Sequence, residues 1–160
     1  MIDQLDEMPA HAAEAILLNV CGSARWSRAM MTRRPFGDLN GLRSAAAASF
    51  DHLDETDWLE AFRAHPRIGE VAPAESLAAS EQRAIVDALG ATMARIIELN
   101  QVYDARFGRI FLIRAAGRTS AEILRELERR LINDDATELG EAAREQREIS
   151  LRRLETLFSP

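Results

Sequence analysis

The run His65-Pro66-Arg67-Ile68-Gly69 contains the residue best suited to proton chemistry in this 160-residue chain, His65. Residues 56–64 before it have the periodicity of an amphipathic helix, which places Trp58, Phe62 and His65 on one face. Because proline disfavours helical backbone at the residue before it, we expect His65 at or just past the last turn, where the helix dipole favours a protonated imidazole. A histidine packed at the edge of the core and bonded to a carbonyl is the alternative.

A carboxylate is expected to face inward at the start of the next long predicted helix, residues 81–106. The apolar stripe of that helix consists of Ile85, Ala88, Leu89, Thr92, Ile96, Leu99 and Tyr103. At about 100° per residue, Glu81 projects within about 40° of this stripe. Its place in the first turn favours the ionised form, because the helix dipole and the backbone N–H groups stabilise it there. A first-turn acid that bonds back to its own N-terminus is the alternative.

An arginine occupies the apolar stripe of the last predicted helix, residues 136–158. This stripe consists of Leu139, Ala142, Ala143, Gln146, Ile149, Ser150, Leu154 and Leu157. Arg153 falls inside it, whereas Arg144, Arg147 and Arg152 project toward the polar side. Since an unpaired buried guanidinium is costly, Arg153 requires a carboxylate partner from the protein or from a ligand. An ion pair with Glu81 is the competing explanation, and the two are compatible if the pair lines a pocket.

His65, Glu81 and Arg153 together suggest an acid–base pair with an anion-binding cation. The three histidines, His11, His52 and His65, lack the spacing of metal ligands, and no glycine-rich phosphate cradle occurs. The chain has no lysine, which excludes a Schiff base through a lysine amine. We therefore expect a site without metal or cofactor that couples proton transfer to stabilisation of a developing anion.

Composition and charge exclude several classes of protein. A length of 160 residues fits a single domain, residues 1–160. The net charge of −6 argues against a nucleic-acid surface, and no apolar run reaches the roughly 20 residues of a membrane span. The acidic N-terminus lacks the regions of a signal peptide, and the one cysteine, Cys21, is predicted to be buried and inert, as suits a reducing cytosol. We therefore expect a cytoplasmic protein.

Helical periodicity recurs along the chain and is interrupted by short turns rich in Gly, Pro, Asn and Asp. The predicted helices cover residues 10–20, 24–33, 39–52, 56–65, 81–106, 120–132 and 136–158. Thr119 and Glu122 have the spacing of a capping box, and the strand-like residues 110–113 are too few to form a sheet. The expected fold is all-α, a single-domain compact bundle of about seven to nine helices, with an irregular segment at 67–79 directly after His65.

Several motifs occur together, in one order, over nearly the whole chain. They are Cys21–Trp26, Arg34–Phe36, Asp57–Gly69, Glu81-Gln82, Leu99–Tyr103, Arg106–Gly108, and Arg130-Leu131 with Asn133. With these motifs the chain resembles the OHCU decarboxylase family, the 2-oxo-4-hydroxy-4-carboxy-5-ureidoimidazoline decarboxylases of urate breakdown. The pattern around His65 is specific, and its combination with the other motifs makes coincidence improbable.

This resemblance implies an all-helical carboxy-lyase, usually dimeric, that converts OHCU to (S)-allantoin without a cofactor. His65 and Glu81 match the catalytic residues of the family. The substrate-binding positions are matched by Pro66, Gln82, Phe111, Leu112, Ile113, Arg114, Ala115 and Arg153, and the backbone of residues 111–115 is the part that closes over the substrate ring. Two departures are visible: Ala78 replaces a common serine, and Arg114 replaces a small residue and either adds a cation near the pocket or points to solvent.

The expected partner is therefore the small molecule OHCU, and the expected assembly is a homodimer that binds neither nucleic acid nor membrane. Two other functions are compatible with the same residues. In the first, the chain is a non-catalytic helical interaction module in which His65-Pro66 forms a turn and Arg153 a structural ion pair. In the second, it is a hydrolase that acts on a related ureido compound.

Overall fold

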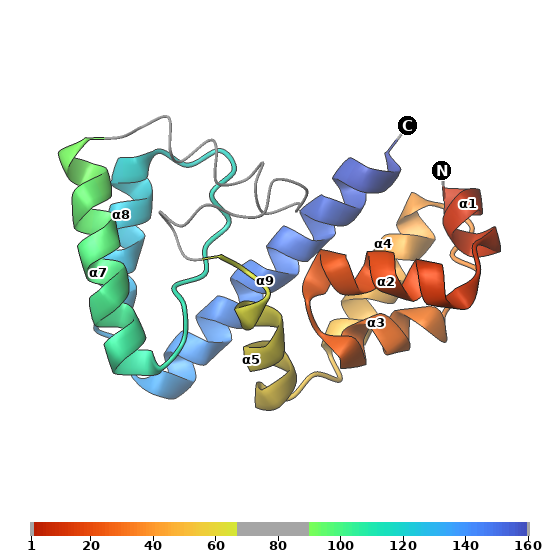
Figure 1. Ribbon diagram of the computed structural model, residues 1–160, viewed down its shortest axis with the longest axis horizontal. Helices are drawn as coiled ribbons and strands as arrows, with labels where there is room; N and C mark the ends of the chain where they lie inside the picture. Colours follow the sequence, from red (N-terminus) through yellow and green to blue (C-terminus); the bar gives the residue numbers. More distant parts are fainter. Residues whose placement is uncertain (1, 67–89, 160) are drawn as a thin grey trace. The chain divides into compact units, whose positions relative to one another are not determined.

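Eight α-helices and no β-strand occur in residues 2–66 and 90–159, the part of the chain that the computed structural model describes (Figure 1). The helices are α1 (Ile2–Glu7), α2 (Ala10–Cys21), α3 (Ala24–Met31), α4 (Leu39–Phe50), α5 (Glu55–Arg63), α7 (Ala91–Phe107), α8 (Ser120–Arg130) and α9 (Asp135–Phe158). None of these described helices is both long and apolar enough to cross a membrane. The all-α prediction is confirmed.

The chain divides into two compact units. The first consists of Met1–Ala64 and Gln146–Pro160, and the second of His65–Glu145. The single domain over residues 1–160 stays a prediction. Helix α9 contributes its N-terminal part to the second unit and its C-terminal part to the first.

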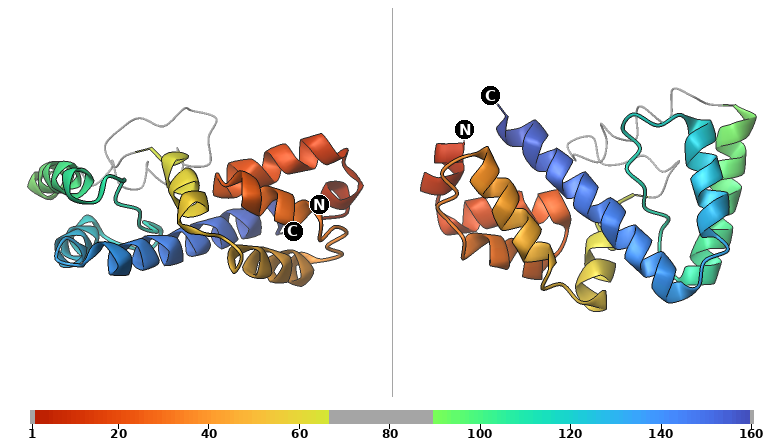
Figure 2. Two further views of the ribbon diagram at one scale, coloured as in Figure 1. Left: turned by 90° about the horizontal axis from the view of Figure 1, so that it is seen from below. Right: turned by 180° about the vertical axis from the view of Figure 1, so that it is seen from behind.

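In the first unit, α2 and α3 lie side by side, and α3 also contacts α4 and α5 (Figure 2). Three of these helices begin with a side-chain cap, because Ser23, Asp38 and Asp54 each accept a hydrogen bond from a first-turn backbone N–H. Four aromatic rings stack in sequence through this unit, with centroid separations of 5.3, 5.7 and 6.5 Å. They belong to Trp26, Phe50, Trp58 and Phe62. The two aromatic side chains predicted to share a face of α5 are thus both in the core.

A glycine lets the turn between α2 and α3 pack against the end of α5. Gly22 adopts the left-handed conformation, with φ at 85°, and its N–H donates to the Leu18 carbonyl at 2.7 Å, which ends α2. A Cβ at Gly22 would lie only 2.5 Å from the Cβ of Ala64. The turn therefore touches the residue that directly precedes His65.

In the second unit, α7 and α8 lie side by side and run in the same direction, so the chain returns along the pair through residues 108–119 (Figure 1). Gly108, with φ at 64°, ends α7, and the predicted capping box of Thr119 and Glu122 begins α8. The core of this unit consists of Met93, Ile96, Leu99, Tyr103, Phe107, Phe111, Ile113, Ile123 and Leu127. The returning segment thus contributes two of its own side chains to the core.

The structure differs from the sequence prediction at the beginning of each of the two described ranges. Helix α1 is missing from the predicted helices, although it buries Leu5. The predicted helix over 81–106 is wrong in its continuity: α7 begins at Ala91, and Gly90 before it is extended, with φ at −169°. Glycine is a poor helix former, which accounts for the break. The other predicted helices are confirmed to within two residues at each end.

Candidate functional site

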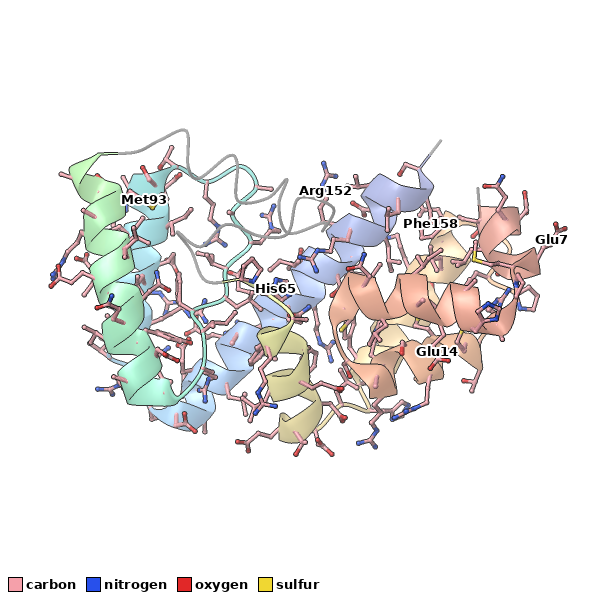
Figure 3. All side chains as sticks on the ribbon, viewed as in Figure 1. Glu7, Glu14, His65, Met93, Arg152 and Phe158 are labelled. Carbon is pink, nitrogen blue, oxygen red and sulfur yellow. The ribbon has the colours of Figure 1, made fainter. Side chains whose placement is uncertain are left out.

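His65 lies directly after the end of α5, as the sequence predicts (Figure 3). A reciprocal capping box between Asp54 and Asp57 begins this helix, and Ala64 caps its C-terminal end. The His65 side chain is buried, with 9% of its surface exposed, and Pro66 is partly buried. A titratable ring is therefore held at a helix terminus, where the carbonyl groups create negative potential.

Side chains from two helices hold the backbone of the predicted substrate segment. The segment comprises Phe111, Leu112 and Ile113, which are buried, and Arg114 and Ala115, which are partly buried. Nη1 of Arg130, on α8, donates to the Leu112 carbonyl at 2.8 Å. The N–H of Arg114 donates to Oε2 of Glu145, on α9, at 2.7 Å. The segment forms no strand, so these two bonds fix its path in place of a sheet ladder.

The Arg114 side chain bonds to the turn that follows its own segment. Its Nη1 donates to the carbonyl of Ala116 at 3.1 Å, on the exposed side of the chain. The second departure from the family pattern, Ala78, lies outside the described residues. Arg114 thus differs from a small residue chiefly in adding a side-chain bond to the turn that follows the segment.

A buried ion pair between Glu138 and Arg130, with two further polar side chains bonded to the carboxylate, lies in the second unit. Glu138 is fully buried, and its Oε1 accepts hydrogen bonds from Nε and Nη2 of Arg130 at 2.8 and 2.5 Å and from the Tyr103 hydroxyl at 2.5 Å. Its Oε2 accepts from Nδ2 of Asn133 at 2.8 Å. The guanidinium of Arg130 also lies over the Phe111 ring, 4.7 Å from its centroid. Burial, and secondarily the bond to Glu138, raises the pKa of Tyr103 well above its usual value, so the hydroxyl stays protonated as a donor.

Sequence reasoning named Arg130 and Asn133 as parts of a motif but did not pair Arg130 with Glu138, yet both charged residues carry a signal. Glu138 lies one turn before Ala142 on the predicted stripe of the last helix. Arg130 follows Ile123 and Leu127 at the spacing that keeps one helix face. Two inward charges of opposite sign on consecutive helices predict a buried pair. The same wheel projection that identified Arg153 would have found them.

Arg153 is buried in the first unit, which confirms its predicted inward position. Its Nη1 donates to the Val20 carbonyl at 3.1 Å, and Nε2 of Gln146, two turns earlier on α9, donates to the Cys21 carbonyl and to Ser150 Oγ, both at 3.1 Å. These donors satisfy carbonyls at the C-terminal end of α2, which have no partner within their own helix. Part of the Arg153 guanidinium is thus used to cap a helix.

The single cysteine is unreactive, as the sequence predicts. Burial raises the pKa of the Cys21 thiol to about 12, despite hydrogen bonds that act in the opposite direction. A thiol with this pKa is protonated at neutral pH and is a weak nucleophile. Cys21 therefore belongs to the core of the first unit.

Glu81 and Gln82 lie outside the described residues. The ion pair between Glu81 and Arg153 that the sequence offers as an alternative therefore stays a prediction. The projection that placed Glu81 inward assumes one helix from Glu81 to Arg106, and the start of α7 at Ala91 removes that basis. The role of Glu81 therefore stays a prediction from the family resemblance. Within residues 2–66 and 90–159, no three His, Cys, Asp or Glu side chains form a group that could hold a metal ion.

The fold and the described site define an all-α protein with a histidine buried at a helix end and a segment of fixed, irregular backbone. The chain belongs to the OHCU decarboxylase family, whose family model matches residues 6–155. It is 37% identical, over 147 residues, to the uric acid degradation bifunctional protein TTL of Arabidopsis thaliana, covering 87% of this chain and 45% of that protein. It is 30% identical, over 128 residues, to the 2-oxo-4-hydroxy-4-carboxy-5-ureidoimidazoline decarboxylase of Haloferax volcanii, covering 79% of this chain and 76% of that protein.

Solved structures of two proteins share the fold. A crystal structure of OHCU decarboxylase in the presence of (S)-allantoin matches with a TM-score of 0.79 and 36% identity, over 89% of this chain and 96% of that one. A structure of (S)-allantoin synthase matches with a TM-score of 0.74 over 99% of this chain and 54% of that one, and at 18% identity it shows the fold alone. The chain spans less than half the length of the Arabidopsis thaliana protein and of a uric acid degradation bifunctional protein from Bacillus sp., so it matches one part of each.

Proposed function

We propose that this chain is a carboxy-lyase that converts OHCU to (S)-allantoin in urate degradation. The observation that carries the proposal is the structural likeness to an OHCU decarboxylase solved in the presence of (S)-allantoin, because it extends over nearly all of that chain. The buried position of His65 supports it independently, since the reaction needs a proton donor in a site that excludes bulk water.

The reaction needs one proton and a place for one electron pair. The substrate has a carboxylate and a hydroxyl on one ring carbon. When the bond to the carboxylate breaks, carbon dioxide leaves and the electron pair passes into the adjoining C=N group of the ring. The hydroxyl proton moves to that ring nitrogen, which leaves an enolate over the hydroxyl-bearing and ureido-bearing carbons. A proton is then added to one face of the ureido-bearing carbon, the enolate oxygen becomes a carbonyl, and one enantiomer of allantoin results. The spontaneous reaction gives both enantiomers, so control of the protonated face is part of the function.

Three charged or titratable side chains divide this work in the proposal. His65 donates the proton, Arg153 binds negative charge on the substrate, and Glu81 orients the hydroxyl or the ureido group. The remaining contacts come from Pro66, Gln82 and the backbone of residues 111–115. Supporting observations are the burial of His65 and Arg153 and the fixed path of the segment. Charge on a buried guanidinium acts strongly on an anionic substrate because little water screens it.

We also propose that the chain acts in the cytoplasm as a homodimer and requires neither metal nor cofactor. The single thiol, Cys21, is buried and protonated, which suits a reducing compartment. Size-exclusion chromatography with light scattering tests the dimer. Activity that survives dialysis against a chelator tests the absence of a metal requirement.

Circular dichroism with freshly made OHCU tests the activity directly. We expect the protein to accelerate product formation and to give an excess of (S)-allantoin, whereas a buffer control gives racemic product at the spontaneous rate. Racemic product at the control rate would leave a non-catalytic interaction module as the better assignment. Acceleration without release of carbon dioxide would indicate hydrolysis of the ureido group.

A further inference from the structure

Two side chains fix the two peptide groups on either side of Ile113. The Leu112 carbonyl, bonded to Arg130, belongs to the peptide group that also contains the Ile113 N–H. The Arg114 N–H, bonded to Glu145, belongs to the peptide group that also contains the Ile113 carbonyl. In a planar trans peptide the C=O and the N–H point in opposite directions. Arg130 and Glu145 therefore set the directions of the N–H and C=O of Ile113 itself.

Each of these side chains is itself held by a second partner. Arg130 uses Nε and Nη2 for Glu138, which leaves Nη1 for the Leu112 carbonyl. Glu145 accepts from Nη2 of Arg118 at 3.1 Å through Oε1, and through Oε2 it accepts the Arg114 N–H. Charge-assisted bonds of this kind are short and directional. Because both partners are fixed, neither side chain needs to be ordered when a substrate arrives.

Ile113 can offer a ligand little except its backbone, because its side chain is buried in the core of the second unit. The N–H and C=O of Ile113 form a donor and an acceptor whose relative direction is set by Arg130 and Glu145. A ring that carries amide N–H and C=O groups, such as a ureido-substituted imidazoline, has the complementary pair.

We propose that Arg130 and Glu145 are positioning residues for the decarboxylation, acting through the backbone of Ile113. This inference rests on the proposed function, which gives residues 111–115 contact with the substrate. Neither residue touches the reacting atoms. Their contribution is to hold a donor and an acceptor in the orientation that the substrate needs, so that binding does not have to order them.

Variants of Glu145 and its ion-pair partner separate positioning from stability. Glu145→Ala removes the acceptor of the Arg114 N–H, and we expect kcat/KM for OHCU to fall roughly 10- to 100-fold while the helical spectrum is retained. Glu145→Gln keeps an acceptor oxygen and should recover most of this loss. Arg118→Met removes the second partner of Glu145 but leaves the acceptor Oε2 in place, so its loss of kcat/KM should be smaller than that of Glu145→Ala. Glu148→Ala, which removes an exposed carboxylate of the same helix, is the matched control and should keep kcat/KM near that of the wild type.

Amide hydrogen exchange gives a readout that does not depend on activity. The Arg114 N–H should be protected in the wild type, in Glu148→Ala and in Glu145→Gln, and should exchange faster in Glu145→Ala. If Glu145 had a merely structural role, Glu145→Ala would lower the melting temperature, but kcat/KM measured well below that temperature would equal that of Glu148→Ala.

Arg130 is tested by Arg130→Lys, because removing the charge altogether would leave Glu138 unpaired and endanger the fold. Lysine can pair with Glu138, but its single ammonium group cannot reproduce the planar fork that also reaches the Leu112 carbonyl. We expect a loss of roughly 10-fold in kcat/KM or more. The exposed neighbour Arg129, changed to lysine, is the matched control and should have little effect. If Arg130→Lys does not fold, the Glu145 variants decide the inference.

The outcomes distinguish this inference from the proposed function. If the wild type does not act on OHCU, the proposed function fails and the inference fails with it. If the wild type is active and Glu145→Ala exchanges the Arg114 N–H quickly but keeps wild-type kcat/KM, only the inference is overturned. An equal loss of kcat/KM in the control Glu148→Ala and in Glu145→Ala overturns it as well.

Discussion

The two backbone regions of the proposed site are held in different ways. His65 follows the C-terminal end of α5, a regular helix that begins with its own capping box, and Gly22 packs against the Ala64 that caps this end. Residues 111–115 have no helix or strand of their own and are held by side chains from α8 and α9. In the first region, the backbone of the helix sets the position of His65, and the contact with Gly22 supports it. In the second, side chains that lie 18 and 31 residues away in the sequence set the path of the backbone.

The buried ion pair gives the largest expected effect on stability. Glu138→Ala leaves Arg130 in the core without its carboxylate, which typically costs about 3–5 kcal/mol. We expect the free energy of unfolding in urea to fall by this amount. Glu128, an exposed carboxylate of α8, is the matched control, and Glu128→Ala should change the free energy by less than about 0.5 kcal/mol. Similar losses in both variants would mean that Arg130 does not depend on Glu138.

Removal of the imidazole should abolish stereospecific chemistry and leave the fold intact. We expect His65→Ala to lower the rate of (S)-allantoin formation by about 100-fold or more, because a positioned proton donor typically contributes at least this factor. The exposed His52 provides the control, and His52→Ala should retain the activity. A His65→Ala variant that melts at a lower temperature but keeps its activity would assign His65 to packing alone.

The contact between Gly22 and Ala64 should be the weak point of the first region. Gly22→Ala places a Cβ on the Ala64 Cβ and forces a left-handed conformation on an L residue, a combined cost of about 1–3 kcal/mol. Gly140, inside α9 with open space around it, is the opposite case. There the change to alanine should stabilise the protein by roughly 0.5–1 kcal/mol. Thermal melts of the two variants check both signs.

Tyr103 should make the second unit sensitive to alkaline pH. Burial and the bond to Glu138 raise the pKa of Tyr103 above its ordinary value of 10.0. The folded state therefore keeps the phenol protonated at a pH where the unfolded state loses the proton. This stability is fully present below about pH 10 and is lost as the pH rises above that value. Tyr103→Phe should lower the free energy of unfolding by about 1 kcal/mol at pH 8, and should show a flatter decline above pH 10. Because Tyr103 is the one tyrosine of the chain, no second phenol complicates the comparison.

The sequence predicted the parts of the site that depend on neighbours in the chain. Pro66 and the spacing of Trp58 and Phe62 were enough to place His65 at a helix end, and the stripe of the last helix was enough to bury Arg153. Both inferences use only helix periodicity and the conformational restriction that proline imposes. All the residues that such a prediction needs lie within a few helical turns of one another in the sequence.

The path of residues 111–115 could not be predicted in the same way. Its two backbone bonds join positions 18 and 31 residues apart, and no local pattern specifies which side chain reaches which peptide group. The break at Gly90 was missed because apolar residues continue at helical spacing on both sides of it, while the backbone there is extended. The role of Glu81 depended on that continuity and now rests on the family resemblance alone.

The backbone of residues 111–115, which returns between α7 and α8, is directed by side chains of other helices, and this has an evolutionary consequence. Arg130 and Glu145 direct the peptide groups around Ile113. The buried side chains of residues 111–115 can therefore change together with the rest of the core, while the N–H and C=O of Ile113 keep their directions. The positions under strong selection should therefore be 130, 138 and 145, on the two helices that follow. In a library of variants, we expect positions 111 and 113 to tolerate other apolar residues, and positions 130 and 145 to tolerate few substitutions.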